Sequence, residues 1–239
     1  MGYYKKSKLQ IENYNSINAA IIKGLLKNIN IQKFKALMIS SVLKKEANDS
    51  LSRLFKPFSE RIIFAREVCK PLINTLYDYS KLGEDRIVLV AYMILKGKIP
   101  GVIIDSGSAV TIDFIKDDKV HAGGYIIPGF DMDFNSLHYN TALLPKHKLP
   151  EKIIDEKPVT TDIAIINGVI KTKGLGIKAL IEEEPANMGL NSKKICIILT
   201  GGSGEILLPF ISKARYIPNA VIMGLIGIYK IEAFNPHIS

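Results

Sequence analysis

The amino-acid sequence predicts an α/β fold, because short apolar runs of strand length are interspersed with longer segments of helical periodicity. The run Val102–Ile104 is of the kind that fills a covered sheet. Apolar side chains also recur at every fourth position from Ile17 to Ile29, which describes one face of a helix. A chain of 239 residues is long enough for one large domain or two small ones, so it has room for two compact lobes.

The elements predicted before residue 100 follow from the same patterns, read in chain order. They are a short strand around Leu9–Ile11, a helix capped by Ser16, a strand over Lys35–Val42, a helix that includes Leu51–Phe55, a strand over Arg61–Ala65 and a helix over Arg86–Lys96.

The elements predicted after residue 100 begin with an antiparallel pattern, in which Thr111–Ile115 turns at Asp117-Asp118 and returns as Val120–Ile127. There follow a helix over Phe130–Leu144, an exposed loop over Leu149–Val159, a long helix capped by Thr160 or Thr161, a buried strand over Lys194–Leu199 and a closing helix over Asn219–Ala233.

The net charge of +9 would suit a nucleic-acid-binding protein, so the distribution of the basic residues matters more than their total. The lysines are scattered, and short runs such as Lys44-Lys45 and Lys193-Lys194 stand at predicted element ends without interleaved aromatic residues. We therefore expect a solvated basic surface that attracts anionic substrates, and no nucleic-acid partner.

The hydrophobic content of 47% is that of an ordinary globular protein, and no apolar run approaches the roughly 18 to 20 residues that span a bilayer. The N-terminus lacks the apolar core of a signal peptide, and Cys69 and Cys196 are the two cysteines. We expect no membrane association, a cytoplasmic location, and two thiols that are buried and inert.

The segment Gly101–Asp113 reads as a buried strand, a turn of small residues and a second strand. Its turn begins with Asp105 and continues as Ser106-Gly107-Ser108, so backbone amides and two hydroxyls can donate to a phosphate while the carboxylate holds a cation. A tight hairpin with an exposed aspartate fits the same pattern.

A second short motif, Gly83-Glu84-Asp85-Arg86, opens a predicted helix twenty positions before Asp105. Acidic residues that complement the helix dipole would explain Glu84 or Asp85 taken singly. The alternative is that both carboxylates, Asp85 and Asp105, face one cleft.

These two motifs, together with three later ones, resemble type III pantothenate kinases. The later motifs are Gly123-Gly124-Tyr-Ile-Ile-Pro128-Gly129, Thr141-Ala-Leu-Leu-Pro145 and Thr200-Gly-Gly202, and they stand in the family's order and spacing from about Lys35 to the C-terminus. The resemblance implies two ribonuclease-H-like lobes, as in actin, sugar kinases and heat-shock ATPases, which we place at residues 1–98 and 99–239. It also implies ATP-dependent phosphorylation of pantothenate to 4′-phosphopantothenate, the first step of coenzyme A synthesis.

The resemblance implies a role for each site residue. Asp85 corresponds to the proton acceptor, Asp105 to the ligand of a monovalent cation (potassium or ammonium), and Ser108 to the hydroxyl that contacts ATP, which brings magnesium. The positions implied for pantothenate are Tyr77, Gly83, Glu84, Asp85, Arg86 and Thr161, the last because it stands seven residues before Gly168. On residue chemistry alone, Tyr77 also fits the edge of a core and Thr161 a helix cap.

Further expectations concern the first strand, the assembly and activity of the protein, His121 and a second glycine-rich turn. The Asp-x-Gly-Asn-Thr strand with which these kinases begin has no match in Met1–Asn30. Either the chain is truncated at its start or it is a family member that has lost this element, and in both cases we expect the first lobe to lack its first strand. The resemblance implies a homodimer, and a catalytically impaired binding or regulatory protein is the alternative to a kinase. His121 has no second ligand at metal-binding spacing and is assigned to structure, whereas Thr200-Gly-Gly-Ser-Gly204 followed by a helix suits anion binding.

Overall fold

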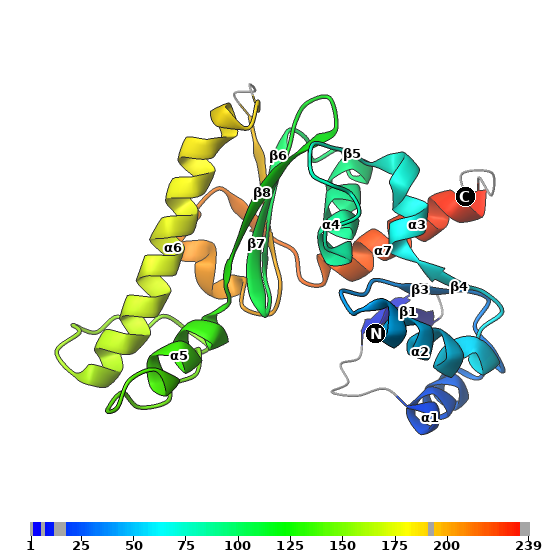
Figure 1. Ribbon diagram of the computed structural model, residues 1–239, viewed down its shortest axis with the longest axis horizontal. Coiled ribbons are helices and arrows are strands. Elements are labelled where there is room, and N and C mark those ends of the chain that lie inside the picture. The colour runs from blue at the N-terminus through cyan, green and yellow to red at the C-terminus, as the bar shows by residue number, and fades with distance from the viewer. Residues whose placement is uncertain (1, 6–7, 12–17, 191–193, 235–239) are drawn as a thin grey trace. The chain divides into compact units, whose positions relative to one another are not determined.

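The computed structural model describes residues 2–5, 8–11, 18–190 and 194–234, and these form two compact units (Figure 1). Unit 1 holds the described residues within Met1–Leu72, Gly83–Tyr92 and Val221–Ser239, and unit 2 holds Ile73–Leu82 and Met93–Ala220. This division differs from the contiguous lobes 1–98 and 99–239 expected from the sequence. The difference arises because the short strand β5 (Asn74–Thr75) pairs with a strand of unit 2, whereas Gly224 near the C-terminus packs against Val88 in unit 1.

Unit 2 is built on a six-stranded sheet with the strand order β10-β9-β6-β7-β8-β5. Strands β6 (Gly101–Ser106), β7 (Ala109–Ile115) and β8 (Val120–Pro128) are sequentially antiparallel, as the sequence predicted. Strand β9 (Cys196–Thr200) runs parallel to β6, and β10 (Ala214–Tyr216) runs parallel to β9. In the ribonuclease-H-like arrangement, three strands are antiparallel and two more pair in parallel beside the first of them. The sheet of unit 2 has this arrangement, so the predicted fold class is confirmed.

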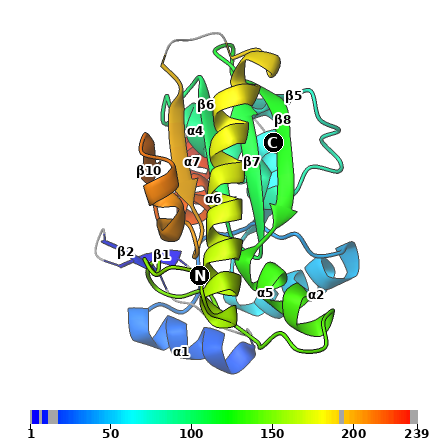
Figure 2. The ribbon, with the colours of Figure 1, turned by 90° about the vertical axis from the view of Figure 1, so that its left-hand side faces the viewer.

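Two helices cover one face of this sheet, α5 (Phe130–Tyr139) and the long α6 (Thr161–Asn187), which lies along the strands in Figure 2. Thr160 caps α6, because its side chain accepts the backbone N–H of Ile163 at 3.3 Å. Helix α5 ends five residues before the predicted Leu144. The core between the helices and the sheet contains Val102, Ile104, Val110, Ile112, Phe114, Phe130, Phe134, Ile165, Ile170, Ile177 and Ile181.

Unit 1 contains helices around two pairs of strands in its described part. Strands β3 (Leu37–Ile39) and β4 (Ile62–Phe64) are parallel, and β1 (Gly2–Lys5) and β2 (Lys8–Ile11) are antiparallel. The helices are α1 (Ala19–Ile29), α2 (Lys45–Phe55), α3 (Ala65–Cys69), α7 (Ala220–Phe234) and the first part of α4 (Glu84–Leu95). Asn18 caps α1 through the N–H of Ile21, whereas the predicted cap Ser16 lies outside the described residues.

Both cysteines are free, but only Cys69 is fully buried. Burial, with the charge of Glu84 as a second cause, raises the pKa of the Cys69 thiol to about 12, so this thiol is inert as expected. Cys196 is half-buried because it is the first residue of β9. Among the helices of the described residues, none has the length and apolar character that a bilayer crossing requires.

Candidate active site

The turn after β6 carries the candidate phosphate-binding residues of unit 2. Asp105 is half-buried in the last part of β6, Ser106 is buried, and Ser108 is exposed on the connection to β7. The turn is closed by the N–H of Gly107, which donates to the carbonyl of Ala109 at 3.1 Å. The strand therefore delivers a carboxylate and an exposed hydroxyl to its carboxyl end, as the sequence predicted.

A second turn packs directly against the first, because β9 runs parallel to β6 with Thr200 in register with Asp105. Gly201 follows with φ +88°, and a side-chain carbon there would overlap the Asp105 carboxylate and lie 2.5 Å from the carbonyl carbon of Ser106. The N–H of Ser203 donates to the carbonyl of Ser106 at 3.0 Å. Gly201 is thus required for the close approach of the two turns.

The element after this second turn differs from the expectation. Residues Glu205–Phe210 form a short 3-10 helix, and the predicted anion site at a helix N-terminus is therefore not formed there. Thr200 instead caps α7, since its hydroxyl oxygen accepts the N–H of Ala220 at 3.3 Å. Of the glycines of this segment, Gly201 serves the contact with the Asp105 turn.

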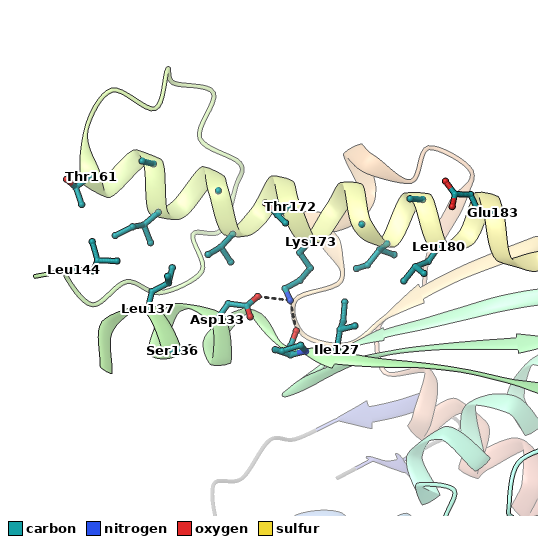
Figure 3. Close-up of a pocket in the computed structure, with 18 residues that line it drawn as sticks. Ile127, Asp133, Ser136, Leu137, Leu144, Thr161, Thr172, Lys173, Leu180 and Glu183 are labelled. Carbon is teal, nitrogen blue, oxygen red and sulfur yellow. Dashed lines mark hydrogen bonds and ion pairs between the residues drawn. The ribbon is translucent and has the colours of Figure 1, made fainter. Parts of the chain in front are cut away.

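A third turn reaches the same place from the end of β8. Gly129 lies so close to Ser108 that a side-chain carbon would overlap the Ser108 carbonyl oxygen and approach its carbon to 2.7 Å. Lys173 of α6 fixes this turn, because its Nζ donates to the carbonyl of Pro128 and pairs with Asp133 at 2.7 Å (Figure 3). Sequence analysis missed Lys173. The signal that could have found it is a lysine at a position of the helix that the apolar periodicity marks as buried.

Negative charges lie close to Tyr216, beside the turn that carries Asp105. Burial, and then the negative charges of Glu205 and Asp105, raise the pKa of Tyr216, whose hydroxyl donates to the carbonyl of Gly201 at 3.0 Å. The Asp105 carboxylate offers oxygen ligands of the kind that hard cations prefer. No group of three or more His, Cys, Asp or Glu suited to holding a metal ion occurs among the described residues.

The Gly83-Glu84-Asp85-Arg86 motif lies in unit 1, at the start of α4. The buried Glu84 carboxylate accepts the backbone N–H of Arg66 at 2.8 Å and of Ser41 at 3.2 Å. Burial raises the pKa of Glu84, and these two N–H groups partly oppose the shift. Glu84 therefore ties the motif to the segments that follow β3 and β4.

Asp85 and Arg86 differ in exposure although they are adjacent. Asp85 is half-buried, and its Oδ1 accepts the N–H of Arg86 at 2.8 Å, whereas Arg86 is only 3% exposed. A side-chain carbon at Gly83 would come to 2.6 Å from Asp85 Oδ1. The glycine of the motif leaves space for the Asp85 carboxylate.

Tyr77 and Thr161 both belong to unit 2 but lie toward opposite ends of β8. Tyr77 is 39% exposed and follows β5, which pairs with Val120 and His121 at the beginning of β8. Thr161 is the first residue of α6 and lines a pocket at the other end of the strand, beside Pro128. Pro128 is seven positions after His121 in β8, which corresponds to about 23 Å of extended strand.

The pocket that Thr161 lines lies between α5, α6 and the end of β8 and has a volume of about 1050 Å³ (Figure 3). Its wall is mostly apolar, with Leu137, Leu144, Val169 and Leu180 among the lining residues. Lys173 and Asp133 are polar lining residues that lie between Thr161 and Glu183 along the pocket (Figure 3). Thr161 thus lies at one end of a mostly apolar pocket.

The fold and these turns define a class, the phosphotransferases and ATPases with ribonuclease-H-like lobes. Comparison with known proteins identifies the family: a model of type III pantothenate kinases matches residues 6–183, beginning before the Lys35 noted from the motifs. The chain belongs to the type III pantothenate kinase family.

Individual relatives support this assignment. The chain is 36% identical over 188 residues to the type III pantothenate kinase of Flavobacterium psychrophilum, covering 75% of this chain and 72% of that protein. It is 32% identical over 204 residues to that of Thermosipho africanus, covering 82% and 77%. A crystal structure described as a Baf family transcriptional activator from Campylobacter jejuni has a TM-score of 0.56 and 26% identity, covering 90% of this chain and 88% of that one.

Proposed function

We propose that this protein phosphorylates pantothenate with ATP to give 4′-phosphopantothenate, the first step of coenzyme A biosynthesis. The observation that carries the proposal is the convergence of three glycine-containing turns around Asp105 and Ser108, in a chain that belongs to the type III pantothenate kinase family. The glycines of these turns have no side chain and so allow phosphate oxygens to approach backbone N–H groups. The Ser108 hydroxyl contributes a further donor to ATP.

Asp85 is the proton acceptor in this proposal. The primary hydroxyl of pantothenate loses its proton as it attacks the terminal phosphorus of ATP, and a carboxylate within hydrogen-bond reach accepts it. Phosphoryl-transfer transition states are loose, so positioning and neutralisation of charge contribute more than the base. Arg86 supplies positive charge next to Asp85, and Gly83 and Glu84 hold the motif in place.

Asp105 would hold a potassium or ammonium ion, with turn carbonyl groups as further ligands. Such an ion supplies positive charge against the phosphates of ATP, while magnesium enters with the nucleotide. Burial is the main cause of the raised pKa of Tyr216, and the negative charges of Glu205 and Asp105, its further causes, support this placement. The reaction would take place in the cytoplasm, where free thiols such as Cys69 and Cys196 persist.

We further propose that the protein is a homodimer whose pantothenate sites combine residues of two copies. Within one chain, Tyr77 and Thr161 lie toward opposite ends of β8, too far apart to contact one small substrate. The apolar side chains Ile126, Met132 and Leu143 are 60%, 50% and 92% exposed on β8, on α5 and just after α5. A second copy covering this region would bury them and bring its Thr161 to the Tyr77 of its partner.

The activity is tested by incubating the purified protein with pantothenate, magnesium-ATP and potassium chloride, and identifying the product by mass spectrometry. Formation of 4′-phosphopantothenate at a rate that depends on both substrates is expected. Binding of pantothenate without turnover under these conditions would favour the regulatory alternative.

The shared site is tested by mixing Tyr77→Ala with Thr161→Ala, each impaired alone. A mixed dimer has one site with both changes and one with neither, so the mixture should recover activity. If light scattering shows a monomer, or if mixing restores nothing while subunits exchange, the two-copy site is wrong.

A further inference from the structure

Three polar side chains form a hydrogen-bonded row at the edge of the sheet in unit 2, and the mechanism above uses none of them. Asp113 of β7 and His121 of β8 are both 0% exposed, and His121 Nε2 lies 2.8 Å from Asp113 Oδ1. The other ring nitrogen, His121 Nδ1, lies 2.7 Å from the hydroxyl oxygen of the half-buried Thr75 on β5. Burying a carboxylate and an imidazole costs free energy unless both are hydrogen-bonded, as they are here.

The direction of the hydrogen bonds in this row is set by the Asp113 carboxylate, which accepts. His121 Nε2 therefore donates to Asp113. In the tautomer that carries its proton on Nε2, Nδ1 accepts the proton of the Thr75 hydroxyl. The lone pairs of the Thr75 oxygen remain available to accept from elsewhere.

The Thr75 oxygen uses this capacity toward Tyr77. It accepts the backbone N–H of Tyr77 at 3.0 Å, which is a local turn formed by a threonine hydroxyl. The conformation of the chain at Tyr77 is therefore connected, through one hydroxyl, to two fully buried groups of the sheet. A flexible threonine would not hold this turn in one orientation.

The backbone of this segment is weakly held without the side-chain row. Strand β5 has two residues, and it pairs in parallel with β8 at the sheet edge, with Leu76 N–H donating to the carbonyl of His121 at 3.0 Å. Parallel pairing is slightly less stable per residue than antiparallel pairing. The segment Ile73–Leu82 also has unit 1 residues on both sides of it in the chain.

We propose that Asp113 and His121 are positioning residues for substrate recognition, acting through Thr75 to fix the backbone at Tyr77. The inference rests on the proposed function only in its final link, the contact of Tyr77 with pantothenate. Asp113 sets the tautomer of His121, His121 sets the rotamer of Thr75, and Thr75 orients the chain that presents Tyr77. The row therefore affects the affinity for pantothenate and leaves the ATP turns, which lie at the opposite end of β8, unaffected.

The matched pair Thr75→Val and Thr75→Ser tests this, because valine keeps the shape of threonine without the hydroxyl and serine keeps the hydroxyl. In Thr75→Val we expect the KM for pantothenate to rise about five- to tenfold, the range for one lost hydrogen bond, with kcat and the KM for ATP unchanged. Hydrogen exchange of the Tyr77 amide in the ligand-free protein should become about tenfold faster. Thr75→Ser should restore both values toward wild type.

Two results would overturn the proposal: an unchanged exchange rate of the Tyr77 amide in Thr75→Val, or a KM for pantothenate that does not respond to loss of the hydroxyl. Equal rises in the KM of both substrates in the valine and serine variants would indicate a structural role alone, and would also overturn it. If the wild-type protein fails to phosphorylate pantothenate, the proposed function fails, whereas the exchange measurement still decides whether the row fixes Tyr77.

Discussion

Replacing Gly201 by alanine should separate the two turns that meet at Asp105. The glycine has φ +88°, a conformation that costs an L-residue about 1 to 2 kcal/mol. The added methyl group would also overlap the Asp105 carboxylate and lie 2.5 Å from the carbonyl carbon of Ser106, so backbone as well as side chain must move. Overpacking of this kind costs roughly 1 to 3 kcal/mol.

The two contributions together predict that the free energy of unfolding falls by about 2 to 5 kcal/mol, less than the stability of many domains. The folded variant would hold Asp105 and Ser108 displaced from their native positions. Because misplacement by about 1 Å can cost a hundredfold in rate, kcat/KM for ATP should fall at least about tenfold.

Urea unfolding and steady-state kinetics with varied ATP measure both effects, and the adjacent Gly202 supplies the control. A side-chain carbon at Gly202 meets no heavy atom within 4 Å, so Gly202→Ala should stay within about 0.5 kcal/mol of wild type. If the two alanine variants behave alike in stability and in kcat/KM, the argument that Gly201 permits the approach of the two turns is refuted.

Three further variants test single groups. Asp85→Asn should fold normally by circular dichroism yet lose activity by at least about a hundredfold, since an amide cannot accept the proton; near-normal turnover would remove Asp85 from this role. Asp105→Asn should weaken the response of the rate to potassium chloride, and an unchanged titration curve would place the ion elsewhere. Glu84→Gln tests a pH dependence. Burial raises the pKa of Glu84 above the ordinary glutamate value of about 4.3. Protonated Glu84 therefore contributes fully to the free energy of unfolding below that ordinary value, and this contribution is lost as the pH rises through the raised pKa. Between about pH 4 and 7, the free energy of unfolding measured with urea should decline in wild type and should decline less in Glu84→Gln. The same pH dependence in both proteins would count against this assignment.

The strands of unit 2 were predictable where burial leaves a pattern in the sequence and not where pairing alone makes a strand. Strand β6 is an apolar run and β7 alternates, so their positions follow from local sequence. Strands β5 and β10 have two and three residues and include Asn74 and Arg215, so no periodicity marks them. They exist because β8 and β9 offer free edges to pair with, which is information from distant parts of the chain.

The residues of the candidate site were also predictable only in part. Asp105 and the glycine at 201 were recognisable as a carboxylate and a turn at strand ends, because chain direction places strand ends together. Lys173 was overlooked, since a lysine in an amphipathic helix is usually solvated. Its burial depends on Asp133 and the Pro128 carbonyl, which neutralise and hydrogen-bond it and which only the folded chain brings near.

The chain passes between its two units four times, at residues 72/73, 82/83, 92/93 and 220/221. A single backbone nick at any of these places would therefore leave both units joined through the remaining connections. Neither unit corresponds to one uninterrupted stretch of codons, so a gene cut once cannot encode either of them intact. Recombination with a related gene would have to exchange several segments together to keep each unit whole.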